Sequence, residues 1–134
     1  MQVDGRAQRT LWADPGGLSF SVLDQRALPH CWQTLSLADL PAVENAIRDM
    51  VVRGAPLIGA TAAYGLALQA NQDTDEPALR AAAERLAATR PSAVNLRWAL
   101  ERMLSRLLAA EPARRAALAW ALAAELADAD VACN

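Results

Sequence analysis

Apolar and polar positions along the chain change their spacing near residue 38. Before that point the apolar residues form short runs, and residues 18–23 alternate with the period of a half-buried strand. Residues 10–13 and 31–37 are further candidate strands, and the sequence DPGG at residues 14–17 is a strong turn signal. The pattern predicts a small antiparallel β-meander over residues 1–37.

After residue 38 the apolar positions recur at helical spacing. Breaks at residues 53–56, 71–76 and 90–92 and a proline at 112 divide this part into about five helices. Ser36 and Asp39 are alternative N-caps of the first helix, and Ser92 is a candidate N-cap of the fourth. We expect an α+β fold in one domain, with the meander at about 1–37 and helices over 38–134. The fifth helix has no stop signal, which fits either a frayed end or a chain cut within a longer protein.

Composition narrows the classes of function. Hydrophobic residues make up 54% of the 134 residues, charged residues 21%, and the net charge is −2. A dedicated nucleic-acid surface would need a basic excess, so no nucleic-acid partner is expected. The longest uncharged run, residues 54–70, is short of the roughly 20 apolar residues of a membrane span, and residues 1–10 are too polar for a signal peptide. A cytoplasmic protein is expected.

Metal and cofactor chemistry finds little support in the sequence. His30 is the one histidine, and the two cysteines, Cys31 and Cys133, are too far apart in the chain to form a CxxC pair. A zinc site or a Ser-His dyad needs clustered partners. No metal site and no cofactor are therefore expected. The four tryptophans are scattered, which favours core or interface packing over a stacking platform.

The sequence RGAP at residues 53–56 has the features of an anion site at the start of a helix. Pro56 stands where a missing N–H costs nothing, and Gly54 allows a ligand to approach the backbone. The first N–H groups of a helix lack internal partners and carry partial positive charge. An anion bound there would also meet Arg53, which offers a full charge and a planar set of donors.

A second arginine repeats this arrangement. Arg90 precedes Pro91, which disfavours helical geometry at Arg90 and leaves it in the loop before the next helix. If the two helices pack side by side with the same polarity, Arg53 and Arg90 can reach one phosphate. Taken singly, either arginine could instead be a loop residue that pairs with an acid. The small residues Gly59 and Gly65 indicate close helix packing, with Tyr64 in the core.

Two segments together resemble the methylthioribose-1-phosphate isomerases of methionine salvage. They are RGAPLIGATAAYG at 53–65 and RPSAVNLRWAL at 90–100, and the lead-in AVENAIRDMVV at 42–52 is also similar. The likeness extends over nearly the whole chain. That family is related to the regulatory subunits of initiation factor 2B and to ribose-1,5-bisphosphate isomerases.

The resemblance implies an aldose–ketose isomerase that converts 5-methylthioribose 1-phosphate to 5-methylthioribulose 1-phosphate, without a cofactor and as a homodimer. It assigns substrate binding to the segment Arg53, Gly54 and Ala55 and to Arg90. The family's catalytic cysteine and aspartate, and its doubly wound α/β domain, would lie beyond Asn134. No residue of this chain is therefore expected to be catalytic, and the chain alone is expected to be inactive.

Two other functions stay open. One is a non-catalytic regulatory or binding module related to the initiation-factor subunits. The other is an isomerase of a related phosphosugar, such as ribose 1,5-bisphosphate.

Overall fold

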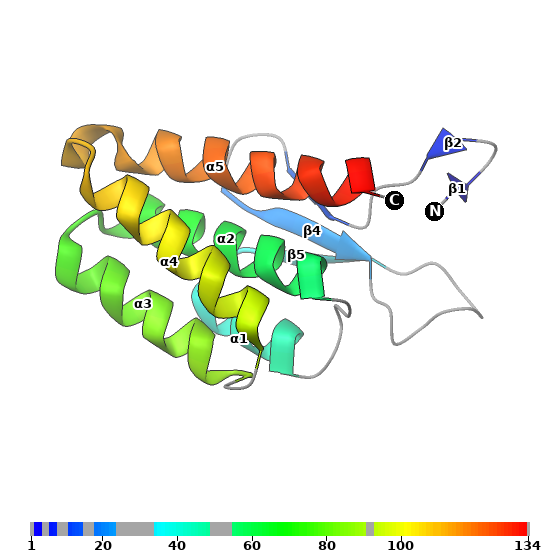
Figure 1. Ribbon diagram of the computed structural model, residues 1–134, viewed down its shortest axis with the longest axis horizontal. Helices are drawn as coiled ribbons and strands as arrows, with labels where there is room; N and C mark the ends of the chain where they lie inside the picture. The colour runs from blue at the N-terminus through cyan, green and yellow to red at the C-terminus, as the bar shows by residue number, and fades with distance from the viewer. Residues whose placement is uncertain are drawn as a thin grey trace.

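The computed structural model describes residues 2–3, 6–7, 11–14, 18–23, 34–48, 55–90 and 93–133. Strands occupy the first part and helices the second, so the expected α+β fold is confirmed (Figure 1). The change from strand to helix falls between residues 37 and 40, close to the boundary that the hydropathy pattern indicates.

The strands form two antiparallel groups. β1 (Gln2–Val3) pairs with β2 (Arg6–Ala7), a short ladder that the sequence pattern did not predict. β3 (Leu11–Ala13), β4 (Phe20–Leu23) and β5 (Thr34–Leu37) form the predicted meander with β4 in the centre. The register places Phe20 opposite Leu37 and Val22 opposite Leu35. Phe20 and Val22 are fully buried, so one face of this sheet belongs to the core.

The five described helices are α1 (Leu40–Arg48), α2 (Ala55–Gln72), α3 (Glu76–Ala88), α4 (Val94–Leu108) and α5 (Pro112–Cys133). Their ends agree with the predicted breaks to within a few residues. None of them is both long and apolar enough to cross a membrane.

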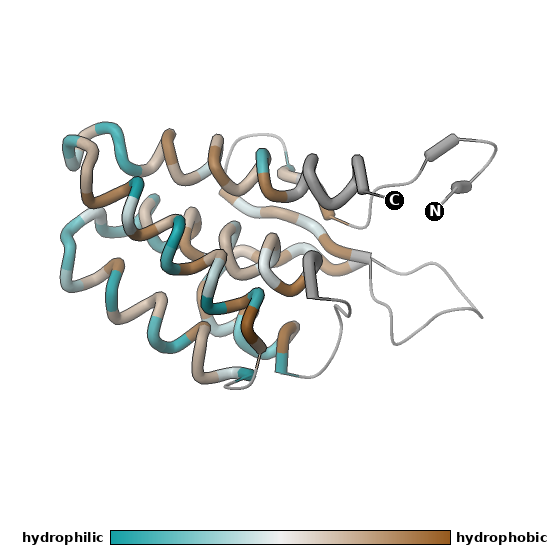
Figure 2. Tube along the Cα trace, viewed as in Figure 1, coloured by the Kyte–Doolittle hydropathy of each residue, from teal (hydrophilic) through white to brown (hydrophobic). Residues whose placement is uncertain are grey.

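α2 is the central helix of the bundle, because α1, α3, α4 and α5 all pack against it (Figure 1). Its residues from 58 to 68 are buried on every side, which explains why this segment contains no charged residue. Figure 2 shows the same division, with hydrophilic residues spaced along α3 and α4 and few along α2.

Tyr64 of α2 joins the sheet to the helices. Its ring stacks on Phe20 of β4, with centroids 5.0 Å apart, and meets Trp120 of α5 edge-on at 5.5 Å. The side chain is only 2% exposed, so the predicted core position of Tyr64 is confirmed. Trp98 is 53% exposed and is no core residue. The side chains of Trp12 and Trp32 lie outside the described part.

The predicted N-caps are partly corrected. Asp39 caps α1, because its Oδ1 accepts a hydrogen bond of 2.9 Å from the N–H of Ala42. Ser36 lies within β5 instead, where its hydroxyl donates to Asp14. The cap position of α4 is Ala93 and not Ser92, because Ala93 has the extended backbone of a residue that precedes a helix.

Candidate functional site

The start of α4 has no side-chain cap. A turn closed by a hydrogen bond of 3.0 Å from the N–H of Ala93 to the carbonyl of Arg90 leads into the helix. Ala93 then occupies the cap position with φ −82° and ψ 102°, and its methyl group cannot accept a hydrogen bond. The first N–H groups of α4 therefore receive no acceptor from their own cap residue, and they remain suited to an anion.

The starts of α2 and α4 lie side by side. A Cβ atom placed on Gly59 would stand 3.3 Å from the Cβ of Ala99 and 3.3 Å from the backbone oxygen of Asn95. Gly59 is four residues into α2, about 6 Å along its axis, and Asn95 is the second residue of α4. Figure 1 agrees, since both helices begin on the same side of the molecule and run away from it together.

Charge distinguishes these two helix starts from the other three in the described residues. Acidic side chains stand at the remaining starts: Asp39 before α1, Asp75 and Glu76 at α3, and Glu111 before α5. An acid at the N-terminus of a helix satisfies its partial positive charge and repels an incoming anion. The first turns of α2 and α4 carry no acid, and an arginine precedes each helix in the sequence.

The structure describes only two of the four predicted site residues. Ala55 is the first residue of α2, one position earlier than the sequence suggested, and Arg90 lies in the turn before α4, partly exposed. Arg53 and Gly54 lie outside the described residues, so the meeting of the two guanidinium groups stays a prediction. Sequence reasoning missed Asn95 and Ala99 as neighbours of α2. It also missed the contrast in charge among the helix starts, which the positions of Asp and Glu would have revealed.

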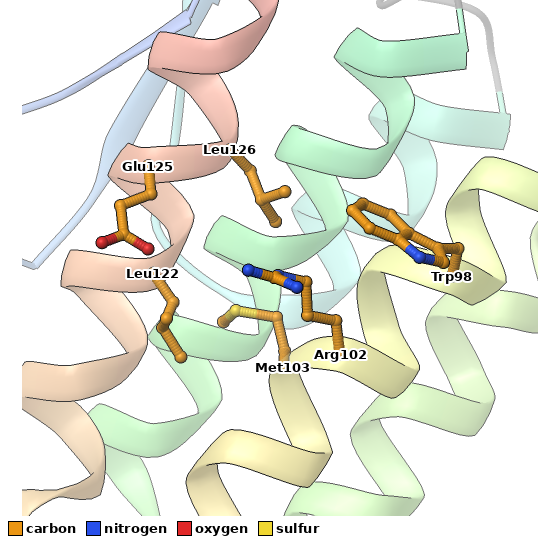
Figure 3. A pocket seen from close by; sticks show the side chains of 6 residues that line it. All are labelled: Trp98, Arg102, Met103, Leu122, Glu125 and Leu126. Atoms are coloured by element: carbon orange, nitrogen blue, oxygen red, sulfur yellow. The ribbon is translucent and has the colours of Figure 1, made fainter.

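A separate groove runs between α4 and α5 (Figure 3). Its volume is about 260 Å³, and it is lined by Trp98, Arg102, Met103, Leu122, Glu125 and Leu126. The guanidinium carbon of Arg102 lies 5.7 Å from the centroid of the Trp98 ring, a cation–π distance. Arg90, the predicted site residue whose side chain the structure describes, is not among these lining residues, and the groove combines both signs of charge with apolar walls.

One polar cluster ties the three strands of the meander together. The carboxylate of Asp14 accepts hydrogen bonds from the hydroxyls of Ser19, Ser21 and Ser36, at 2.7, 2.7 and 3.1 Å. Burial alone would raise the pKa of Asp14, but these hydrogen bonds outweigh it and hold the pKa below its ordinary 3.8. Because the hydroxyls come from the turn before β4, from β4 and from β5, the cluster links the three strands and stabilises the sheet.

The described residues contain no group of three His, Cys, Asp or Glu side chains that could hold a metal ion. His30 and Cys31, and the side chain of Cys133, lie outside the part that the structure describes. The groups that the described part of the site offers to a ligand are the backbone N–H groups at the starts of α2 and α4 and the guanidinium of Arg90.

Comparison with known proteins identifies the family of this chain. Residues 51–128, more than half of the chain, match the Initiation factor 2 subunit family, and both helix starts lie within that segment. The chain belongs to this family. The methylthioribose-1-phosphate isomerase of Methylorubrum populi is 53% identical over 132 residues, which cover 98% of this chain and 36% of that enzyme. The chain thus spans about a third of the length of this curated relative.

Two solved structures share the fold. The 5-methylthioribose 1-phosphate isomerase from Pyrococcus horikoshii has a TM-score of 0.83 at 33% identity, over 94% of this chain and 37% of that one. The translation initiation factor eIF-2B subunit delta from A. fulgidus has a TM-score of 0.84 at 36% identity, over 93% of this chain and 38% of that one. The fold alone does not separate the isomerase from the initiation-factor member of the family.

Proposed function

We propose that this chain supplies the phosphate-binding part of an aldose–ketose isomerase that acts on 5-methylthioribose 1-phosphate. The observation that carries the proposal is the pair of acid-free helix starts that meet at Gly59 and Asn95, each preceded in sequence by an arginine. A phosphate at that point would take hydrogen bonds from both helix ends and from Arg53 and Arg90.

The sequence relatives favour the isomerase over a purely regulatory role. The two solved structures are equally similar in fold, but the M. populi isomerase is 53% identical over nearly all of this chain. A phosphorylated sugar also suits the site, because the helix starts recognise the phosphate and require no contact with a base or a peptide. Ribose 1,5-bisphosphate would satisfy the same chemistry, so a panel of phosphosugars decides between the two substrates.

In this proposal the chain positions the substrate and supplies no acid or base. Fixing the phosphate aligns the sugar carbons with reactive groups elsewhere in the enzyme, a contribution of orientation. The 134-residue chain alone is then expected to bind the phosphosugar and to show no isomerase turnover. Turnover by the purified chain would contradict this division of roles.

The experiment uses a chimera in which this chain replaces the matching part of the M. populi isomerase. Arg53→Ala and Arg90→Ala should each raise KM by about 10- to 150-fold, the effect of losing one charged hydrogen bond of about 1.5–3 kcal/mol. Arg80→Ala is the matched control, because Arg80 is exposed on α3 and pairs with Glu76 at 2.7 Å. Unchanged kinetics in both site variants would refute the proposed phosphate site.

A further inference from the structure

Gly59 faces the first turns of α4 without a side chain between the two helices. A Cβ atom at this position would come within 3.3 Å of both the Ala99 Cβ and the backbone oxygen of Asn95. Contacts of that length are tighter than ordinary van der Waals contacts, so the neighbouring atoms would have to give way. One of these neighbours is helix backbone, which cannot turn aside as a flexible side chain can. An added methyl group would therefore press α2 and α4 apart by a few tenths of an ångström at this crossing.

We propose that Gly59 is a positioning residue that sets the separation of the two helix starts, so that one phosphate can contact both. This inference rests on the proposed phosphate site and assigns a cause to its geometry. Hydrogen bonds from N–H groups to oxygen are effective over a narrow range, about 2.7–3.2 Å. A shift of a few tenths of an ångström at the crossing would leave the phosphate well placed for one helix start and too far from the other.

The cost of glycine in a helix supports this role. Glycine within a helix is less favourable than alanine by about 1 kcal/mol. α2 nevertheless has glycine at 59, where the contact is with α4, and at 65, where the contact is with α1 and α3.

Gly65 is a matched control on the same helix. Its added Cβ would come within 2.8 Å of Val43 Cγ1 and 3.4 Å of both Cδ atoms of Leu86, a tighter fit than at Gly59. It lies ten residues beyond the start of α2, about 15 Å along the axis. Gly65→Ala should therefore lower stability more than Gly59→Ala does, yet leave the helix starts in place.

The test measures stability and affinity separately on the purified chain. Amide NMR titrations with 5-methylthioribose 1-phosphate give the Kd, and thermal unfolding gives the Tm. Gly59→Ala should raise the Kd about five-fold, because displacements near 1 Å can cost about 100-fold and this one is smaller. Gly65→Ala should leave the Kd of the folded protein unchanged while lowering the Tm further. The double variant Gly59→Ala/Ala99→Gly removes one of the two close contacts and should recover part of the affinity.

The outcomes separate this inference from the proposed site. If Gly59→Ala and Arg90→Ala both leave the Kd unchanged, the proposed phosphate site itself is refuted. If Arg90→Ala weakens binding while Gly59→Ala and Gly65→Ala both leave it unchanged, only the positioning role of Gly59 is refuted. Should Gly59→Ala not fold, Ala99→Ser enlarges the opposite side of the same contact. It should also weaken binding, and an unchanged Kd in that variant overturns the proposal.

Discussion

Arg115 holds three segments of the chain together, and its removal should be costly. Its Nε donates to the carbonyl oxygens of Leu107 and Ala110, at 2.9 and 3.3 Å, and its Nη1 donates to the carbonyl of Thr74 at 2.7 Å. The residue is only 9% exposed. One guanidinium thus satisfies carbonyls at the C-terminal end of α4 and in the connection between α2 and α3, from a position in the first turn of α5.

Arg115→Ala should lower the free energy of unfolding by about 2–4 kcal/mol. Hydrogen bonds to a charged group contribute about 1.5–3 kcal/mol each, and two of the three are short enough to count fully. Water that reaches the freed carbonyls would recover part of that loss. For a chain of this size the melting temperature should fall by roughly 10 °C.

Urea unfolding followed by circular dichroism measures this effect, and the neighbouring arginine provides the control. Arg114 is exposed on the same turn of α5, so Arg114→Ala should change stability by no more than about 0.5 kcal/mol. Arg115→Lys keeps the charge but lacks the planar fork of donors, and should fall between the two alanine variants. Equal stability of Arg115→Ala and Arg114→Ala would refute the role described for Arg115.

Two further predictions concern the sheet and a helix pair. The pKa of Asp14 is lowered in the folded chain, so its hydrogen bonds stabilise the fold above pH about 4 and are lost as the pH falls through the folded pKa. The difference in free energy of unfolding between wild type and Asp14→Asn, measured with urea, should therefore be largest at pH 7 and shrink as the pH falls. A difference that is independent of pH would contradict this prediction. Glu44 and Arg85 form an ion pair between α1 and α3 in which Arg85 is half-exposed, so Arg85→Ala should cost at most about 1 kcal/mol, and less in 1 M salt. A larger loss that salt does not reduce would contradict a screened surface pair.

Much of the fold could be predicted because the spacing of apolar residues changes sharply. A proline stands within a few residues of the start of each described helix, and the uncharged run at residues 54–70 indicated the central helix. The pairing of β1 with β2 was not predictable, because two-residue strands in a polar segment leave no periodic signal. Asp14 was interpreted only as a turn residue. Its links to Ser21 and Ser36 depend on strand register, which no local pattern reveals.

The candidate site was predictable in its parts and not in its assembly. Arg90 before a proline and a helix start could be recognised from chemistry alone. That α2 and α4 lie side by side depends on their packing, which the sequence does not show. The role of Gly59 in that packing can be recognised only when the structure places Asn95 and Ala99 next to it. The N-cap at Ser92 was wrong because the chain extends one residue further before α4 begins at Val94.

The most direct test of the shared anion site is an amide NMR titration of the wild-type chain with 5-methylthioribose 1-phosphate. The first-turn amides of α2 and of α4 should shift together and fit one dissociation constant, because a single phosphate contacts both helix starts. Shifts at only one helix start, or two unequal constants, would contradict the account.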